Sequence, residues 1–253
     1  MQPMNTQAPV VKVPEITLGF WVVKIAATTL GETAGDAVSM SLGLGYLAAT
    51  GLFAAFLVAA VIAQIRARRF NAWLYWTAII ATTTVGTTLA DFADRSLGIG
   101  YSGGTLILLA LLLATLFFWY RTLGTVSISS VSSARSEFFY WATVTFSQTL
   151  GTALGDWTAD TAGLGYTGGI AVFVGLLTIT ALAYRWTRIS HTLLFWAAFV
   201  LTRPLGAVLG DLLDKPISDG GLELSRIGAS AALMVFILAC VALLPQRAAS
   251  TQH

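Results

Sequence analysis

The sequence predicts an all-α polytopic membrane protein, a bundle of eight transmembrane helices arranged as four parallel two-helix repeats. Of its 253 residues, 56% are hydrophobic and only 10% are charged, whereas a soluble domain carries about 25% charged residues. Four stretches of about 20 residues contain no charge, enough for a helix to cross a hydrocarbon core of about 30 Å. These stretches are Tyr46–Ile65, Tyr101–Tyr120, Tyr166–Tyr184 and Ile227–Gln246.

A fourfold internal repeat is the second observation behind this fold class. An aspartate follows each of four tryptophans by 15 residues, a glycine lies five residues before each aspartate, and a small residue directly precedes it. Self-similarity of this kind is typical of repeat architectures. The tryptophans are Trp21, Trp76, Trp141 and Trp196, and the aspartates are Asp36, Asp91, Asp156 and Asp211.

Each repeat is predicted to contain a first helix with the tryptophan, glycine and aspartate, and a second, plainly apolar helix. An even number of spans per repeat makes all four point the same way. We expect a tail at 1–15, repeats 1 and 2 at 16–126, a Ser-rich linker at 127–136, repeats 3 and 4 at 137–245, and a tail at 246–253. In repeats 1 to 3, a Gly-x-Gly-Tyr turn joins the two helices.

Basic residues concentrate at the termini and at the even-numbered connections, which the positive-inside rule places in the cytoplasm. Both termini are therefore predicted to be cytoplasmic. The residues on this side are Lys12, Arg66, Arg68, Arg69, Arg121, Arg135, Arg185, Arg188 and Arg247.

The repeated tryptophans, with their glycines and aspartates, carry a resemblance. From about Phe20 to Leu244, the chain resembles a bacterial family of integral membrane proteins with four tandem copies of a two-helix, tryptophan-containing repeat of unknown function. The resemblance implies a multi-pass protein of the bacterial cytoplasmic membrane, and it implies no activity and no residue role. The fourth copy departs from the pattern, because a longer polar segment replaces its Gly-x-Gly-Tyr turn.

The first helix of each repeat carries a narrow polar stripe at positions eight, four and zero before the aspartate, which share one helix face. Polar side chains inside a spanning helix face the bundle interior or a wet cavity. We therefore expect four stripes to converge on a central axis. They are Thr28, Glu32 and Asp36; Thr83, Thr87 and Asp91; Gln148, Thr152 and Asp156; and Arg203, Ala207 and Asp211.

The four repeated aspartates and Glu32 are the candidate metal ligands. Carboxylate and hydroxyl oxygens suit hard cations such as Mg²⁺, Mn²⁺ or Ca²⁺, and neighbouring carboxylates can also hold protons. An alternative is that the aspartates are structural and hydrogen-bond to neighbouring helices or cap a turn. Asp94, Asp160 and Asp214 are placed at the outer mouth, where they either attract cations or are solvated loop residues.

Two basic residues inside spans, Lys24 and Arg203, qualify this hypothesis. They either partner Glu32 and the aspartates in a neutralised structural network, or form a gate or an anion site. Counting both, the interior carries five negative and two positive charges, a balance that favours a cation.

Two further features have interpretations that concern packing alone. The paired glycines of Gly31–Gly35, Gly151–Gly155 and Gly206–Gly210 let helix backbones approach. The tryptophans are interpreted as anchors in the aromatic belt at the inner membrane interface.

Several function classes are excluded or disfavoured by composition. The formal net charge of +2 gives no basic field for nucleic acid, and the single cysteine, Cys240, excludes a multi-thiolate metal site. The spans hold no histidine and no recognisable activated nucleophile, so an enzyme is not expected.

The sequence favours a transporter or channel-like carrier in the lipid bilayer, moving an inorganic cation or protons, with a divalent cation as ligand or substrate and no resident cofactor. The alternative is a membrane scaffold or sensor module whose polar stripes are structural.

Overall fold

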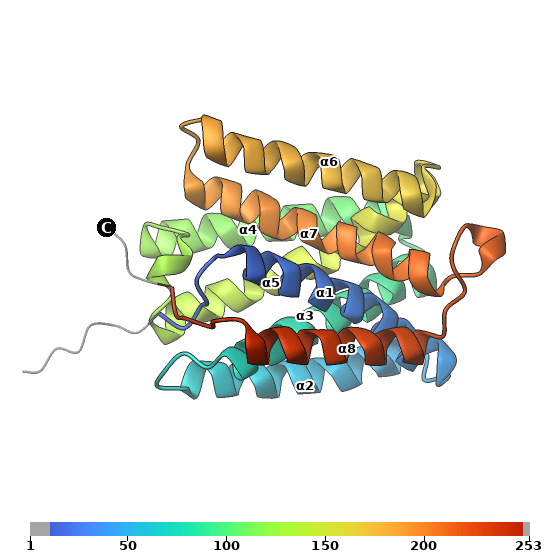
Figure 1. Ribbon diagram of the computed structural model, residues 1–253, viewed down its shortest axis with the longest axis horizontal. Helices are drawn as coiled ribbons and strands as arrows, with labels where there is room; N and C mark the ends of the chain where they lie inside the picture. The colour runs from blue at the N-terminus through green and yellow to red at the C-terminus, as the bar shows by residue number, and fades with distance from the viewer. Residues whose placement is uncertain (1–10, 250–253) are drawn as a thin grey trace, which may run out of the picture.

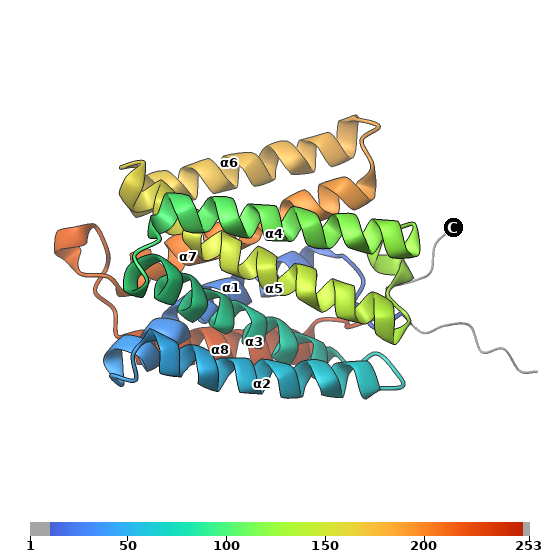
Figure 2. The ribbon, with the colours of Figure 1, turned by 180° about the vertical axis from the view of Figure 1, so that it is seen from behind.

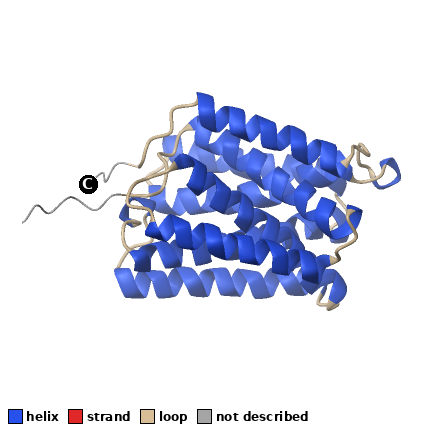
Figure 3. Ribbon diagram, turned by 90° about the horizontal axis from the view of Figure 1, so that it is seen from below, coloured by secondary structure: helices blue, strands red, loops and turns tan. Residues whose placement is uncertain are grey.

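The computed structural model describes residues 11–249, and within these the chain forms eight long helices and no β-strand (Figure 3). The predicted all-α class and the helix count are confirmed. The helices are α1 (Leu18–Asp36), α2 (Tyr46–Arg66), α3 (Ala72–Asp91), α4 (Gly100–Leu123), α5 (Ala134–Asp156), α6 (Gly165–Trp186), α7 (His191–Asp214) and α8 (Arg226–Leu243).

The first helices of the four repeats form an inner ring. Helix α1 contacts α3 and α7, and α5 contacts the same two helices, which closes the ring. Each second helix packs outside this ring on the first helix of the following repeat: α2 on α3, α4 on α5, α6 on α7, and α8 back on α1 (Figures 1 and 2). The repeats are therefore interlocked, and the predicted linker does not separate two halves.

The inner helices meet at the repeated glycines. In each repeat, the glycine five residues before the aspartate lies against the residue eight before the aspartate of the next repeat. A Cβ on any of these glycines would lie between 2.0 and 2.9 Å from its neighbour. The four contacts are Gly31 with Thr83, Gly86 with Gln148, Gly151 with Arg203, and Gly206 with Thr28.

Three threonine hydroxyls fasten two of these close approaches, the one between α1 and α3 and the one between α7 and α1. Thr83 Oγ1 donates to Ala27 O at 3.1 Å, Thr87 Oγ1 to Gly31 O at 3.1 Å, and Thr28 Oγ1 to Thr202 O at 3.1 Å. In lipid, an apolar side chain gains no hydrophobic free energy by leaving the lipid tails for another helix. Small residues and interhelical hydrogen bonds therefore hold the helices together. The glycines thus act in packing, as the sequence indicated.

Five of the described helices are long and apolar enough to cross a membrane: α2, α4, α6, α7 and α8. Helices α1, α3 and α5 fall outside this group, and each of their stripes holds three polar residues where that of α7 holds two. Their polar side chains are buried in the ring, and the outer helices present exposed leucine, isoleucine, valine and phenylalanine side chains. The fold is that of a membrane-type helical repeat protein with a polar interior.

The connections at the aspartate end differ between the repeats. In repeats 1 to 3, one π-helical turn follows the aspartate: Ala37–Ser41, Phe92–Ser96 and Trp157–Thr161. In the first of the tight turns beyond, Gly43 and Gly45 have φ of 70° and 75°, a conformation that favours glycine. In repeat 4, α7 continues to Asp214, and Leu222 N–H donates back to Leu212 O at 2.7 Å.

The terminal segments meet at the opposite end of the bundle, where Ala249 N–H donates to Val13 O at 2.8 Å. Of the predicted tails at 1–15 and 246–253, residues 1–10 and 250–253 lie outside the described part. The predicted linker at 127–136 runs into α5, which begins at Ala134 with a capping box between Ser133 and Ser136.

The interpretation of the tryptophans as belt anchors is wrong for three of the four, and the fourth, Trp21, is half-buried. Trp76, Trp141 and Trp196 are buried, because each packs against the aromatic residue that precedes the tryptophan of the previous repeat. The ring centroids lie 5.4 to 6.1 Å apart, a distance typical of favourable aromatic pairs. The pairs are Phe20 with Trp76, Tyr75 with Trp141, Tyr140 with Trp196, and Phe195 with Trp21.

We predict that Gly86→Ala destabilises the bundle while Gly175→Ala does not. The new methyl group at residue 86 would lie 2.9 Å from the backbone of Gln148 and Thr149, which no side-chain rotation can relieve. Overpacking of this kind lowers the free energy of unfolding by about 1–3 kcal/mol. Each kcal/mol lost lowers the Tm by about 2–4 °C. Gly175, on α6, has open space around its Cβ position. Thermal unfolding in detergent compares the two variants, and equal melting temperatures would contradict the close-packed ring.

Candidate cation site on the bundle axis

The axis of the inner ring is lined by layers of four residues, one from each repeat. Because residues four apart share a helix face, stepping back from the aspartates in fours gives successive layers. The aspartate layer and the two layers behind it contain every predicted site residue except Lys24. All four residues of each layer are buried. The expected convergence of the stripes on one axis is confirmed.

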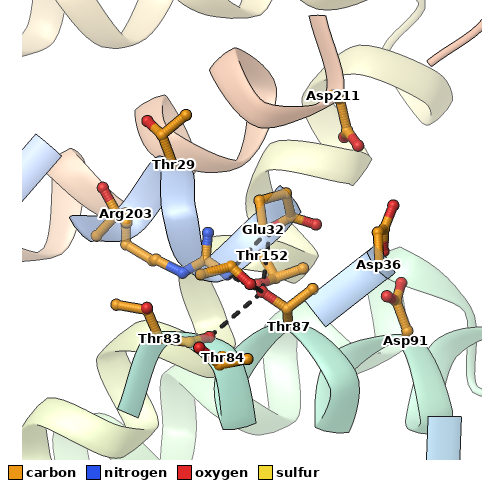
Figure 4. A network of polar contacts seen from close by, with 12 residues as sticks. Thr29, Glu32, Asp36, Thr83, Thr84, Thr87, Asp91, Thr152, Arg203 and Asp211 are labelled. Carbon is orange, nitrogen blue, oxygen red and sulfur yellow. Dashed lines mark hydrogen bonds and ion pairs between the residues drawn. The ribbon is translucent and has the colours of Figure 1, made fainter. Parts of the chain in front are cut away.

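The four aspartates form a carboxylate layer near one end of the axis, with at most 3% of each residue exposed. Figure 4 shows Asp36 and Asp91 facing the same space from neighbouring helices, with Asp211 across from them. Two sets of three carboxylates have oxygens within 4.8 Å of one another: Glu32, Asp36 and Asp91, and Asp36, Asp211 and Asp214. These are the groups that could hold a metal ion among the described residues.

Basic side chains from the connections enter this layer and divide it into two pairs. Arg95 joins Asp91, at 3.1 Å from Nε, to Asp156, at 3.5 Å from Nη2. Lys215 Nζ joins Asp36 to Asp211, with 3.1 Å to the latter. Each basic residue lies four positions after the aspartate of its own repeat. It also contacts the aspartate of the following repeat, which for Lys215 in repeat 4 is Asp36 in repeat 1. The layer therefore has twofold rather than fourfold character.

Arg226 extends the Lys215 pair. Its Nε lies 3.4 Å from Asp214 Oδ2 and 3.9 Å from Asp36 Oδ2. Of the three aspartates placed at the outer mouth, Asp94 and Asp214 are buried and Asp160 is exposed. The two roles expected for these aspartates, solvated loop residue or cation attractor, do not describe Asp214, which belongs to the ion-paired cluster.

Lys215 remains charged in this setting. Burial by itself would lower the pKa of its ammonium group, but the carboxylates of Asp211, Asp36 and Asp214 outweigh that effect and raise the pKa above its usual value. The ammonium thus occupies a position between carboxylates that an inorganic cation would favour.

Arg95, Lys215 and Arg226 were not among the predicted site residues, and they lie at or beyond the ends of the long helices. The ion-paired cluster holds six carboxylates, Glu32, Asp36, Asp91, Asp156, Asp211 and Asp214, and four basic groups, Arg203, Arg95, Lys215 and Arg226. If all are ionised, the cluster carries two negative charges, six minus four. The expected count of five negative and two positive charges included Lys24, which lies outside this cluster, and left out Asp214, Arg95, Lys215 and Arg226. The signal available was an arginine or lysine four residues after two of the aspartates, the spacing of a helical ion pair.

One layer deeper, Arg203 and Glu32 form an enclosed ion pair. Arg203 Nη2 lies 3.0 Å from Glu32 Oε2 and also donates to the hydroxyls of Thr87 and Thr152 (Figure 4). Neither residue reaches solvent, since Arg203 is 0% exposed. For Arg203, the predicted partnership with Glu32 is therefore present.

Gln148 shares the layer of Arg203, eight residues before the aspartates. Its side-chain oxygen and nitrogen are buried and have no hydrogen-bond partner among the described residues, and the same holds for Arg203 Nε and Nη1. Buried polar groups are normally hydrogen-bonded, so this layer retains capacity for a polar guest such as water.

Within residues 11–249, Lys24 has no carboxylate partner, so the first of its two predicted roles, a pairing with Glu32 or an aspartate, is absent. Its Nζ donates to Thr202 Oγ1 at 3.3 Å and lies 4.2 Å from the centre of the Phe199 ring. The reason is distance along the helix: Lys24 precedes Glu32 by two turns, about 12 Å.

Beyond Lys24, the axis is closed by aromatic side chains. The layer sixteen residues before the aspartates contains Phe20, Tyr75, Tyr140 and Phe195, and the hydroxyls of Tyr75 and Tyr140 are 2.6 Å apart. The axis is thus polar toward the aspartate end and sealed toward the terminal segments.

Comparison with known families matches four copies of one family model, described as Repeat of Unknown Function (DUF347), at residues 19–70, 74–125, 139–190 and 194–246. The chain belongs to this family. The matched copies coincide with the four repeats of the structure. No curated protein and no solved structure gave a match to the chain.

We predict that Arg203→Met destabilises the protein strongly and that adding Glu32→Gln restores much of the loss. Removing one partner of a buried ion pair costs about 3–5 kcal/mol because the other charge stays buried, whereas neutralising both costs far less. Thermal unfolding of the wild type, both single variants and the double variant gives the coupling. Additive losses would show that the two residues do not compensate each other.

Proposed function

We propose that this member of the four-repeat family binds an inorganic cation in its carboxylate layer and carries that cation, or protons in exchange for it, across the membrane. The observation that carries the proposal is the pairing of buried carboxylates around Lys215 and Arg95. A tethered ammonium or guanidinium in such a position is a stand-in that a free cation can replace.

Carboxylate chemistry supports a hard, divalent cation. Oxygen ligands favour Mg²⁺, Mn²⁺ and Ca²⁺ over soft metals. The set of Asp36, Asp211 and Asp214 brings three carboxylates within 4.8 Å of one another, so displacement of Lys215 would leave them for an ion. Asp36 belongs to both carboxylate sets, which makes it the central ligand of the proposal.

Solvent exposure supports displacement of the basic side chains in the aspartate layer, but not displacement of Arg203 deeper in the ring. The side chains of Lys215 and Arg95 are 12% and 32% exposed, and both residues lie on connections at the end of the bundle. They can swing toward water when a cation binds. Arg203 is enclosed and cannot, so we assign the Arg203–Glu32 pair to stability rather than exchange.

Transport in this scheme needs a second state. The cation enters from the aspartate end, and release at the opposite end requires the aromatic layer of Phe20, Tyr75, Tyr140 and Phe195 to part. Lys24 lies between that layer and Arg203, where its Nζ donates to Thr202 Oγ1. No chemical reaction is assigned to the chain.

One observation favours the alternative of a non-transporting scaffold or sensor. Ten charged groups of the cluster form ion pairs within the described residues, so the carboxylates already have partners. In that reading the cluster only specifies how the repeats assemble, and no ion stabilises the protein.

We predict that a divalent cation raises the Tm of the wild type and that the double substitution Asp36→Asn with Asp156→Asn abolishes the rise. These residues supply one carboxylate of each pair. A ligand present at 100 times its Kd stabilises the folded state by about 2.7 kcal/mol. Thermal shifts with Mg²⁺, Mn²⁺, Ca²⁺ and Zn²⁺ measure the effect. A wild type indifferent to every ion would leave the scaffold as the better account.

We further predict that Lys215→Met lowers the Tm without added cation and enlarges the cation-induced rise, because it removes the tethered competitor. Arg121→Met is the matched control: Arg121 is exposed at the far end of α4, and its loss should change neither quantity. An unchanged cation response in Lys215→Met would contradict competition at this position.

The proposed location is the bacterial cytoplasmic membrane, with both termini in the cytoplasm and the carboxylate layer near the outer surface. Reporter fusions after Arg68 and after Ser218, on connections at opposite ends of the bundle, should report opposite compartments. The same compartment for both would exclude this topology.

A further inference from the structure

A groove of about 620 Å³ opens on the side of the bundle, away from the axis. It lies between α1, α6 and α7, and residues 127–129 close one side of it. Helix α6 is the helix at the top of Figure 1. The walls of the groove are mainly apolar and include Trp21, Ile25, Leu177, Tyr184 and Phe195. Its volume lies within the range of about 300–1,000 Å³ that is typical of ligand pockets.

The repeat symmetry shows why this groove is open. Trp119 on α4 and Tyr184 on α6 are equivalent, since each lies 28 residues after the aspartate of its repeat, Asp91 and Asp156. Trp119 is fully buried and packs on Tyr140 and Trp196. Tyr184 is 57% exposed. The volume that the indole fills in one repeat is left open in the next.

The equivalent position in the first repeat is also covered. Gln64, 28 residues after Asp36, is buried, and its Nε2 donates to Lys12 O at 3.0 Å. Lys12 in turn donates to Ile65 O at 2.8 Å and lies 2.7 Å from Glu137. The segment before α1 therefore covers that position. At the α6 groove, residues 16–18 and 127–129 form part of the wall but leave Tyr184 57% exposed.

The surroundings of the groove indicate what enters it. Two of its walls, α6 and α7, are helices apolar enough to cross a membrane, so a bilayer around the bundle would bring lipid to the mouth of the groove. At the end of the groove that Tyr184 and His191 line, the connection between these residues carries Arg185 and Arg188, both exposed. Basic residues at this position attract anionic headgroups, by about 1 kcal/mol for each near the membrane surface.

We infer that the groove binds one acyl chain of an anionic phospholipid, with the headgroup held at Arg185 and Arg188. The acyl chain takes the position that Trp119 occupies in the neighbouring repeat, against Trp21 and Phe195. Bound there, the lipid completes the packing between α6 and α1. This site is independent of the carboxylate layer.

The test is native mass spectrometry of the full chain released from vesicles of equal parts phosphatidylglycerol and phosphatidylcholine. The wild type should retain one phosphatidylglycerol. Ala181→Trp, which fills the groove from α6, should lose at least tenfold of this adduct. Ala171→Trp is the control, since Ala171 lies on the same helix, is exposed and does not line the groove. Size-exclusion chromatography and Tm verify that each variant is folded.

Replacement of both Arg185 and Arg188 by Gln should leave one lipid bound and remove the preference for phosphatidylglycerol. Equal adducts in the wild type and Ala181→Trp would overturn the proposal, as would equal losses in the two tryptophan variants. A wild-type dimer that Ala181→Trp dissociates would overturn it in favour of a second copy as the occupant. If Ala181→Trp fails to fold, Ala198→Phe on α7 fills the same groove from the other wall and carries the same expectations.

Discussion

The close approach of successive inner helices at the repeated glycines is the constraint on which the rest of the structure depends. A side chain at Gly31, Gly86, Gly151 or Gly206 would overlap the next helix, so the ring closes only with glycine there. In lipid, such contact supplies the van der Waals packing that apolar burial cannot. The same contact points every fourth residue of α1, α3, α5 and α7 at the axis, and it thereby stacks residues from four repeats into common layers.

Because the four stripes meet on one axis, their carboxylates lie close together, and the repeats differ in how they compensate this negative charge. Four aspartates in one buried layer repel one another, and two of the repeats supply a basic residue four positions later, Arg95 and Lys215. The fourfold backbone therefore carries a twofold charge pattern. Deeper in the ring, Arg203 replaces the Thr28 and Thr83 of other repeats and compensates Glu32. Divergence between the copies is thus concentrated where identical side chains would leave charge unbalanced.

The repeat, the helix order, the polar axis and the packing role of the glycines could be predicted from sequence, because each follows from spacing within one helix. The ion pairs of Lys215 and Arg226 could not, since they depend on how the connection 215–225 folds back over the ring. Burial of Trp76, Trp141 and Trp196 was missed for a related reason. A tryptophan near a helix end suits a membrane interface equally well, and its burial depends on the aromatic residue that the previous repeat brings against it. For Lys24 the sequence left two roles open, and distance along α1 separates it from Glu32 and so removes the pairing.

The central claim is that a free cation and the Lys215 ammonium compete for the same carboxylates. The most direct measurement is anomalous X-ray diffraction from crystals of the protein soaked in Mn²⁺. The account predicts a single strong anomalous peak between Asp36, Asp211 and Asp214, with the Lys215 side chain moved out of the layer. Manganese found only at surface carboxylates, with Lys215 still between Asp36 and Asp211, would contradict the account and leave the charged cluster as a structural device.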